Sequence, residues 1–307
     1  MRLLLAGLIC AASMQAATWY VTVAGLGGEP DYEQRFQAWA MTIDNILRGS
    51  RTDARIETLT GAQATRERVR QVLERAAQES RPEDSIVVML IGHGTFDGSE
   101  YKLALPGPDI SASELGALLN KNRAERQLVV NMTSSSGASL EALRKEGRIV
   151  IAATKSGTQR NVTVFPRYWA EALRDPSADT DKNEAISALE AFRYASAKTA
   201  AFYEGQRRLA TEHPVIDDAG TGAGVRDPSG EKGEGRLAAA FTLLRFGAAQ
   251  AAAQDPAKQK LLARREQIEQ EIDRLKYQKA AIPADEYKKE LTKLLLELAR
   301  VQEEIEK

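Results

Sequence analysis

Short apolar runs alternate with longer segments of helical periodicity along the first part of the chain. The apolar runs are rich in β-branched residues and predict strands at Trp19–Ala24, Arg55–Leu59, Ser85–Ile91, Gln127–Asn131 and Arg148–Ala153. The segments between and after them have the apolar spacing of helices, which we expect at Tyr32–Leu47, Ala64–Glu79, Ser111–Leu119, Leu140–Arg144 and Phe165–Leu173. Alternating strands and helices favour a mostly parallel sheet covered on both faces, so we expect an α/β, three-layer sandwich.

The chain continues with a long helix and a glycine-rich stretch. Helical periodicity predicts a helix at Glu184–Leu209, and the glycines and charges of residues 217–236 indicate a mobile surface loop. The stretch Leu237–Ala253 is compatible with helix or strand at FTLLRFG. We expect residues 18–255 to form one domain, since a single core can grow to roughly 250 to 300 residues.

Residues 256–307 carry the apolar pattern of two helices that pack along each other. In the first helix an apolar residue recurs at heptad spacing, at Leu261, Ile268, Leu275 and Ile282. In the second helix the apolar positions are Tyr287, Leu291, Leu294, Leu298, Val301 and Ile305. The connecting sequence AAIPAD predicts a helical hairpin, an antiparallel coiled coil. The pattern leaves open whether this hairpin packs on its own domain or is an arm for self-association or for a partner.

Residues 1–17 have the layout of a secretory signal peptide. Arg2 precedes the apolar run Leu3–Ala12, and small residues follow. We therefore expect the mature chain to be exported, to the periplasm or outside the cell. The run is too short to span a bilayer, and no later stretch reaches about 20 uncharged apolar residues, so no transmembrane segment is expected.

The composition excludes several kinds of chemistry. Cys10 is the single cysteine and lies in the predicted signal peptide, so the mature chain has no thiol nucleophile, disulfide or sulfur ligand. Two histidines are too few for a multi-histidine metal site. With 42 basic against 43 acidic residues, the chain has no general attraction for nucleic acid, and we expect no nucleic-acid partner.

Two groups of candidate catalytic side chains follow predicted strands. His93 comes directly after the strand Ser85–Ile91, in the sequence IGHGTFDG, whose glycines allow a ligand to approach closely. The next strand runs into a hydroxyl cluster, which we define as Thr133, Ser134, Ser135 and Ser136. In open α/β sheets ligands bind at the carboxyl ends of the strands. We therefore expect His93 and the hydroxyl cluster to face one cleft.

These two motifs resemble those of the caspase and legumain superfamily of cysteine peptidases. VVMLIGHG is similar to that family's strand ending in His-Gly, and LVVNMTSSSGA is similar to its strand ending in Ala-Cys-x-Ser-Gly. In this alignment Ser134 stands in the position of the nucleophilic cysteine and His93 in that of the catalytic histidine. The resemblance covers about residues 18–175, and it implies a caspase-like sandwich.

The serine changes what the resemblance implies about activity. A thiol ionises near pH 8.5 or lower, whereas a serine hydroxyl stays protonated and needs a hydrogen-bonded base that a third group orients. Asp97 and Glu100 lie near His93 in sequence, but nothing assigns either of them that role. We expect a catalytically inactive homologue that binds a peptide or protein. The alternatives are a hydrolase with Ser134 as nucleophile and His93 as base, or an oligomerising scaffold built on the hairpin.

The sequence DTDKNEAISALE fits the ligand pattern of a calcium loop. Its candidate ligands are Asp179, Asp181, Asn183, Ala185 (through its carbonyl), Ser187 and Glu190. The sharp turn normally needs glycine where this chain has Glu184, which would have to adopt a left-handed conformation at a cost of about 1 kcal/mol. The alternative is a capped helix start without metal. No other cofactor is expected, because neither a phosphate-binding loop nor a dinucleotide-type glycine turn is present.

Two basic residues are candidates for substrate binding. Lys155 and Arg160 follow the predicted strand Arg148–Ala153 and should lie at the same sheet edge as His93. Either could contact a substrate carboxylate, as the resemblance to acid-specific peptidases implies, or they are ordinary charges of a solvent-facing loop. His213, in the sequence TEHP, is expected only to cap or end the long helix.

Overall fold

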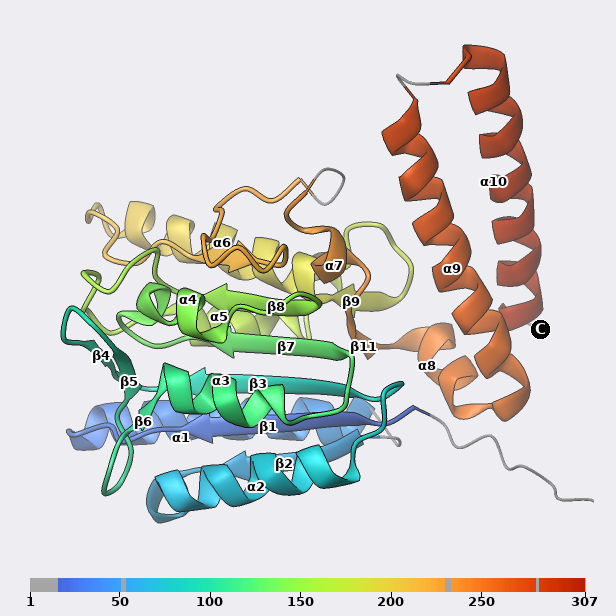
Figure 1. Ribbon diagram of the computed structural model, residues 1–307. Coiled ribbons are helices and arrows are strands. Elements are labelled where there is room, and N and C mark those ends of the chain that lie inside the picture. Colours follow the sequence, from blue (N-terminus) through green and yellow to red (C-terminus); the bar gives the residue numbers. More distant parts are fainter. Residues whose placement is uncertain (1–15, 51–53, 230–232, 280–281, 307) are drawn as a thin grey trace, which may run out of the picture.

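A six-stranded sheet with helices on both faces forms the body of the protein (Figure 1). The computed structural model describes residues 16–50, 54–229, 233–279 and 282–306. The predicted signal peptide, residues 1–17, lies almost wholly outside these residues. Among the described residues, no helix is long and apolar enough to cross a membrane.

The strands and helices have the following bounds. The strands are β1 (Thr18–Ala24), β2 (Ala54–Leu59), β3 (Ser85–Ile91), β4 (Gly94–Phe96), β5 (Tyr101–Leu103), β6 (Ile110–Ser111), β7 (Arg126–Asn131), β8 (Arg148–Ala152), β9 (Ala185–Ser187), β10 (Val215–Asp217) and β11 (Thr242–Arg245). The α-helices are α1 (Pro30–Ser50), α2 (Arg66–Glu79), α3 (Ala112–Asn120), α4 (Leu140–Leu143), α5 (Phe165–Ala172), α6 (Ala188–Gly205), α7 (Arg236–Ala239), α8 (Gly247–Gln254), α9 (Pro256–Gln278) and α10 (Ala284–Glu306). Short 3-10 helices span Gly61–Gln63, Ser136–Ser139 and Pro176–Ala178.

The strand order in the main sheet is β10-β8-β7-β3-β1-β2. All neighbouring pairs are parallel except β10 with β8, which are antiparallel. The five parallel strands agree with the predicted ones to within one residue at each end. The predicted α/β fold with a mostly parallel central sheet is therefore confirmed.

Alternate residues of each strand pack into two separate cores. On one face Tyr20, Val87 and Val130 pack with residues of α1, α5 and α6. On the other face Val21 and Val88 pack with residues of α2, α3 and α4. Successive side chains of a strand point to opposite faces, so a central strand must be apolar at nearly every position. This is why the run SIVVMLI predicts β3 so directly.

The long helix begins later than its periodicity predicts. Helix α6 spans Ala188–Gly205 instead of Glu184–Leu209, because β9 pairs with β11 before the helix starts. Ser187 caps the helix: its side chain accepts from the backbone N–H of Glu190, whose carboxylate accepts from the N–H of Ser187. The ambiguous FTLLRFG sequence contains strand β11.

Three short strands near the carboxyl edge of the main sheet are not predicted by the sequence pattern. Strands β4, β5 and β6 form a separate antiparallel sheet directly after His93. With two or three residues each, they are too short to show an alternating pattern. This small sheet forms one wall beside the hydroxyl cluster.

Helices α9 and α10 run antiparallel and project from the end of the sandwich opposite to β4–β6 (Figure 1). Most of the predicted apolar positions line the contact between them, with Ile268, Val301 and Ile305 buried. The predicted seam residue Ile282 is wrong for this helix, because α9 ends at Gln278 and Ile282 lies in the connection. The base of the hairpin contacts the domain, where buried Arg265 donates to the carbonyl of Asn183 at 3.0 Å.

Candidate functional site

His93 and Ser134 follow two adjacent strands at the same edge of the sheet. Strands β3 and β7 are parallel neighbours, with Leu90 opposite Asn131, and the N–H of Met132 donates to the carbonyl of Leu90 at 2.9 Å. The residues that come next in each strand therefore emerge together at the carboxyl edge. The structure brings the two predicted catalytic positions to one place.

The Ser134 hydroxyl is fully engaged with the backbone of Gly94. Its Oγ accepts from the N–H of Gly94 at 3.0 Å and donates to the carbonyl of Gly94 at 3.0 Å. The side chain is 2 % exposed. Only glycine permits this approach, since a Cβ at position 94 would lie 2.2 Å from the carbonyl oxygen of Ser134. The hydroxyl therefore links the segments that follow the two strands through a pair of hydrogen bonds.

His93 is held by other partners than Ser134. Its Nε2 lies 3.0 Å from the carbonyl oxygen of Gly27. Its half-buried ring meets the rings of Tyr32 and Phe36 edge-on, with centroids 5.3 and 5.2 Å away. Asp97, a candidate to orient His93, is exposed and accepts instead from backbone N–H groups of its own turn. Nothing in these contacts makes His93 a base for Ser134.

Thr133 and Ser136 of the hydroxyl cluster are bonded within the buried interior. Thr133 Oγ1 lies 2.5 Å from the hydroxyl of Tyr101 and 2.8 Å from Asn131 Oδ1. Burial raises the pKa of Tyr101 to about 12, so this phenol is protonated at neutral pH. Ser136 Oγ accepts from the N–H of Thr154 at 3.0 Å. These side chains join β7, β5 and the end of β8.

Ser135 is the strained member of the cluster. Its backbone is left-handed, with φ of 55°, and its N–H donates to the carbonyl of Gln159 at 2.8 Å. Its side-chain oxygen is buried without a hydrogen-bond partner. A left-handed L-residue costs roughly 1–2 kcal/mol, so the tight turn here is held in place by its surroundings.

A loop after β8 covers the cluster and carries the two predicted substrate-binding residues. Gln159 closes this loop: its Oε1 accepts from the N–H of Lys155 at 2.8 Å, and its Nε2 bonds to Nδ1 of His213. Lys155 and Arg160 are exposed and lie on this loop, near the same sheet edge as Ser134. The loop leaves the basic side chains facing solvent and the hydroxyls enclosed.

His213 and Glu212 belong to this region, whereas the sequence pattern predicts only that His213 caps or ends the long helix, which ends earlier, at Gly205. Strand β10 is antiparallel, so the residues before it lie at the carboxyl edge of β8. Burial lowers the pKa of His213, and the nearby charges of Arg226 and Lys155 lower it further. Glu212 is buried, accepts from the N–H of Val164 at 2.7 Å, and has its pKa raised by burial to about 7.

A pocket of about 570 Å³ extends from His213 along α6. Apolar side chains such as Leu209 and Pro214 line it together with Tyr203 and Glu212. Leu209 is 92 % exposed and lies in the segment that follows α6. The pocket offers mixed apolar and polar surface beside the enclosed hydroxyl cluster.

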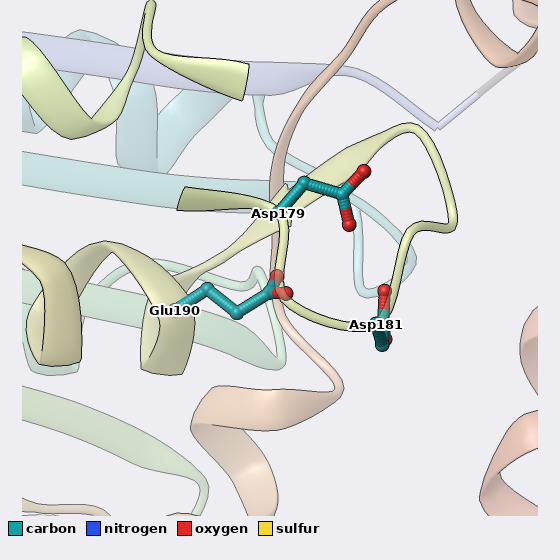
Figure 2. Close-up of side chains that lie close together, drawn as sticks. All are labelled: Asp179, Asp181 and Glu190. Carbon is teal, nitrogen blue, oxygen red and sulfur yellow. The ribbon is translucent and has the colours of Figure 1, made fainter. Parts of the chain in front are cut away.

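Three of the predicted metal ligands converge at the start of α6 (Figure 2). Carboxylate oxygens of Asp179, Asp181 and Glu190 lie within 4.8 Å of one another. Asp181 is exposed as a residue, yet partial desolvation of its carboxylate and the neighbouring charge of Glu190 raise its pKa to about 6. Close carboxylates repel each other unless a proton or a cation intervenes, so this arrangement has the chemistry of a metal site.

The other predicted ligands are engaged within the loop. Asn183 Oδ1 accepts from the N–H of Ala185 at 2.9 Å, and Ser187 Oγ is the cap of α6. Asp179 accepts from the N–H groups of Asn183 and Glu184, at 3.2 and 3.1 Å. Glu184 has φ of 60°, the left-handed conformation that the loop pattern requires of it.

Removing the Ser134 hydroxyl should cost stability. Ser134→Ala leaves the buried N–H and carbonyl of Gly94 without that partner, so the free energy of unfolding should fall by about 1–3 kcal/mol. The matched control is Ser135→Ala, which deletes a neighbouring, equally buried hydroxyl that has no partner and should change stability little. Urea denaturation of both variants measures the difference. Equal losses would show that the Ser134–Gly94 pair does not stabilise the turn.

The acidic loop should make stability depend on pH in the absence of metal. The pKa of Asp181 is raised in the folded protein, so between about pH 4 and 6 the folded state binds more protons than the unfolded state. Its contribution to stability is therefore present at low pH and is lost as the pH rises through about 6. In the presence of a chelator, Asp181→Asn should reduce this decline in the free energy of unfolding. Glu212, whose pKa is also raised, is unchanged by the variant, so the difference between the two proteins reports the carboxylates of the acidic loop. An identical decline in both proteins would show that the raised pKa of Asp181 is not its cause.

Comparison with known proteins gives structural matches but no sequence match. No protein-family model and no curated protein sequence matches the chain. A crystal structure of a protein from Geobacter sulfurreducens matches with 14 % identity and a TM-score of 0.44, over 68 % of this chain and 94 % of the other. The Drosophila initiator caspase Dronc matches with 9 % identity and a TM-score of 0.42, over 68 % of this chain and 82 % of the other. The structural neighbours of the chain thus include a caspase at low identity.

Proposed function

We propose that this protein is a catalytically inactive relative of the caspase and legumain-type peptidases that binds a peptide or protein segment at the carboxyl edge of its sheet. One observation carries the proposal. Ser134 forms both of its hydrogen bonds with the backbone of Gly94, and His93 directs Nε2 to the carbonyl of Gly27. The two side chains stand in the positions of a catalytic pair but do not form one.

The chemistry of the hydroxyl supports the loss of catalysis. A cysteine in the position of Ser134 could ionise and attack without a base in direct contact, whereas serine cannot. A serine nucleophile here would first have to break both bonds to Gly94, and its base would have to turn away from Gly27. The alternative, a hydrolase with Ser134 and His93, requires this rearrangement together with a group that orients the imidazole.

The surface beside the cluster supports a binding role. Lys155 and Arg160 are exposed next to the enclosed hydroxyls, and the pocket that begins at His213 offers apolar contacts along α6. A peptide with an acidic side chain would meet the basic loop and could place apolar side chains in the pocket.

We also propose that the acidic loop binds calcium. The three converging carboxylates are hard oxygen ligands, and the left-handed turn at Glu184 supplies the bend that the calcium-loop pattern places before Ala185. The ion would tie the start of α6 to the segment that the hairpin residue Arg265 contacts. If residues 1–17 direct export, as proposed from the sequence, the protein meets millimolar calcium, which fills even weak sites.

An assay of peptide cleavage distinguishes the proposed inactive protein from an active hydrolase. The purified protein should leave a broad peptide library uncut. Ser134→Cys restores the thiol, and cleavage that appears in this variant and disappears in Ser134→Cys/His93→Ala would support descent from a cysteine peptidase. Mass spectrometry of the library detects the products. Cleavage by the unaltered protein that is lost in Ser134→Ala would contradict the proposal.

Peptide retention tests the binding role. Acidic peptides from the same library should be retained by the immobilised protein, and Lys155→Glu/Arg160→Glu should weaken their retention by roughly tenfold, because opposite charge is replaced by like charge. Lys121→Glu, at an exposed site after α3, is the control and should have no effect. Retention that is equal in all three proteins would mean that the basic loop takes no part.

Calcium should raise the melting temperature of the protein. At about 5 mM calcium a site of millimolar affinity is mostly filled, and binding to the folded state alone stabilises it. Glu190→Gln should abolish the increase yet keep the helix start, because glutamine also serves in a capping box. Glu204→Gln, on the exposed end of the same helix, is the control. Differential scanning fluorimetry measures the shift, and a calcium effect that survives Glu190→Gln would rule out this loop.

A further inference from the structure

Helix α10 exposes apolar side chains that its contact with α9 does not use. Leu291, Leu294 and Leu298 pack toward the core between the two helices. Leu295 and Leu296 lie on another part of the helix surface and are 48 % and 58 % exposed. In the heptad that places Leu294 at d, Leu296 occupies f, the position that points away from the partner helix. The hairpin alone gives no reason for leucine there.

Charges of opposite sign flank these leucines along the same face. A helix turns 100° per residue, so Lys288, Thr292, Ala299 and Glu303 lie on the side of Leu295 and Leu296. All four are exposed. Asp285, which is exposed, also lies on this face, about one turn before Lys288. Next to the leucines the face is thus basic on one side, at Lys288, and acidic on the other, at Glu303.

We infer that α10 pairs antiparallel with α10 of a second copy of the chain, about a two-fold axis between Leu295 and Leu296. In this register Lys288 faces Glu303 of the partner subunit, and the symmetry repeats the contact. Thr292 faces the partner's Ala299, and the four leucines meet at the centre. A parallel pairing would instead bring Lys288 against Lys288 of the partner subunit, so the charges select the antiparallel arrangement.

The geometry of the hairpin makes the pairing sterically accessible. The helix has 23 residues and is about 35 Å long, and the hairpin projects from the end of the sandwich opposite to β4–β6 (Figure 1). A contact between two single helices is smaller than a standard interface, which buries roughly 800 Å² per partner, so we expect a weak dimer with a dissociation constant in the micromolar range. The candidate binding edge of each copy would remain uncovered, and paired copies could hold two peptides at once.

Substitution of the exposed leucines tests the apolar part of the contact. Sedimentation equilibrium of the purified protein between about 5 and 200 µM should show a monomer–dimer equilibrium. Leu295→Glu/Leu296→Glu should remove the dimer over this range. Met41→Glu, which changes an apolar side chain that is 44 % exposed on α1, should leave the dimer intact. Circular dichroism confirms that the exposed substitutions leave the helices folded.

Charge reversal tests the antiparallel register. Lys288→Glu makes both sides of the leucines acidic, and Glu303→Lys makes both sides basic. Each variant alone should lose self-association by at least about tenfold, and a mixture of the two should form a heterodimer. The variant that combines both changes should dimerise again, because the two sides are once more opposite in sign.

Three outcomes would overturn this inference. The first is a protein that is monomeric throughout the concentration range. The second is a dimer that persists in Leu295→Glu/Leu296→Glu. The third is a pair of charge variants that fail to associate when mixed while the unaltered protein dimerises, which would place the contact elsewhere. None of these results depends on whether the sheet edge binds peptides.

Discussion

The hydrogen bonds between Ser134 and Gly94 are the contact on which the candidate site depends. They join the ends of two parallel strands, and they require a glycine on one side and a short hydroxyl side chain on the other. The bond to the carbonyl of Gly94 uses the hydroxyl proton of Ser134, which a catalytic base would have to remove. A residue that stabilises the strand ends in this way is poorly placed to act as a nucleophile, so the structural role and the proposed loss of catalysis have one cause.

The enclosure of the cluster follows from a second set of contacts. The carbonyl of Gln159 accepts from Ser135, while its side chain reaches both Lys155 and His213. The loop is therefore hydrogen-bonded to the turn at Ser135, to itself and to the segment before β10. Because the loop seals the hydroxyls from water, the surface that remains for a partner is basic and lies beside the cluster. This favours recognition of a ligand over reaction with it.

The sequence predicted the five parallel strands of the main sheet but neither β10 nor the small sheet β4–β6, for physical reasons. Strand β3 is buried on both faces, so its apolar run is unmistakable, and the glycine after it predicts the close approach at the sheet edge. Strands β4 to β6 are too short to show periodicity. The loop pattern around Asp181 correctly anticipated the left-handed turn at Glu184 and the convergence of three carboxylates. The bonds of Asn183 within the loop could not be foreseen from ligand spacing.

The contacts of His93 and Ser134 show most clearly what a sequence pattern cannot predict about the site. The order of the strands predicts that both residues reach one edge, but the register of β3 against β7 decides which atoms meet. In this register Gly94 lies opposite the hydroxyl, and the imidazole turns toward Gly27. Likewise, His213 reaches the site only because β10 runs antiparallel to β8, a direction that the sequence does not encode locally.

Reaction of the protein with a fluorophosphonate, which forms a covalent bond only with an activated serine hydroxyl, tests the central claim most directly. Intact-mass spectrometry should detect no adduct after prolonged incubation, since the Ser134 hydroxyl is hydrogen-bonded to Gly94 and no base contacts it to remove its proton. An adduct mapped to Ser134 that is absent from His93→Ala would show a working catalytic pair, and the account of an inactive binding protein would be wrong.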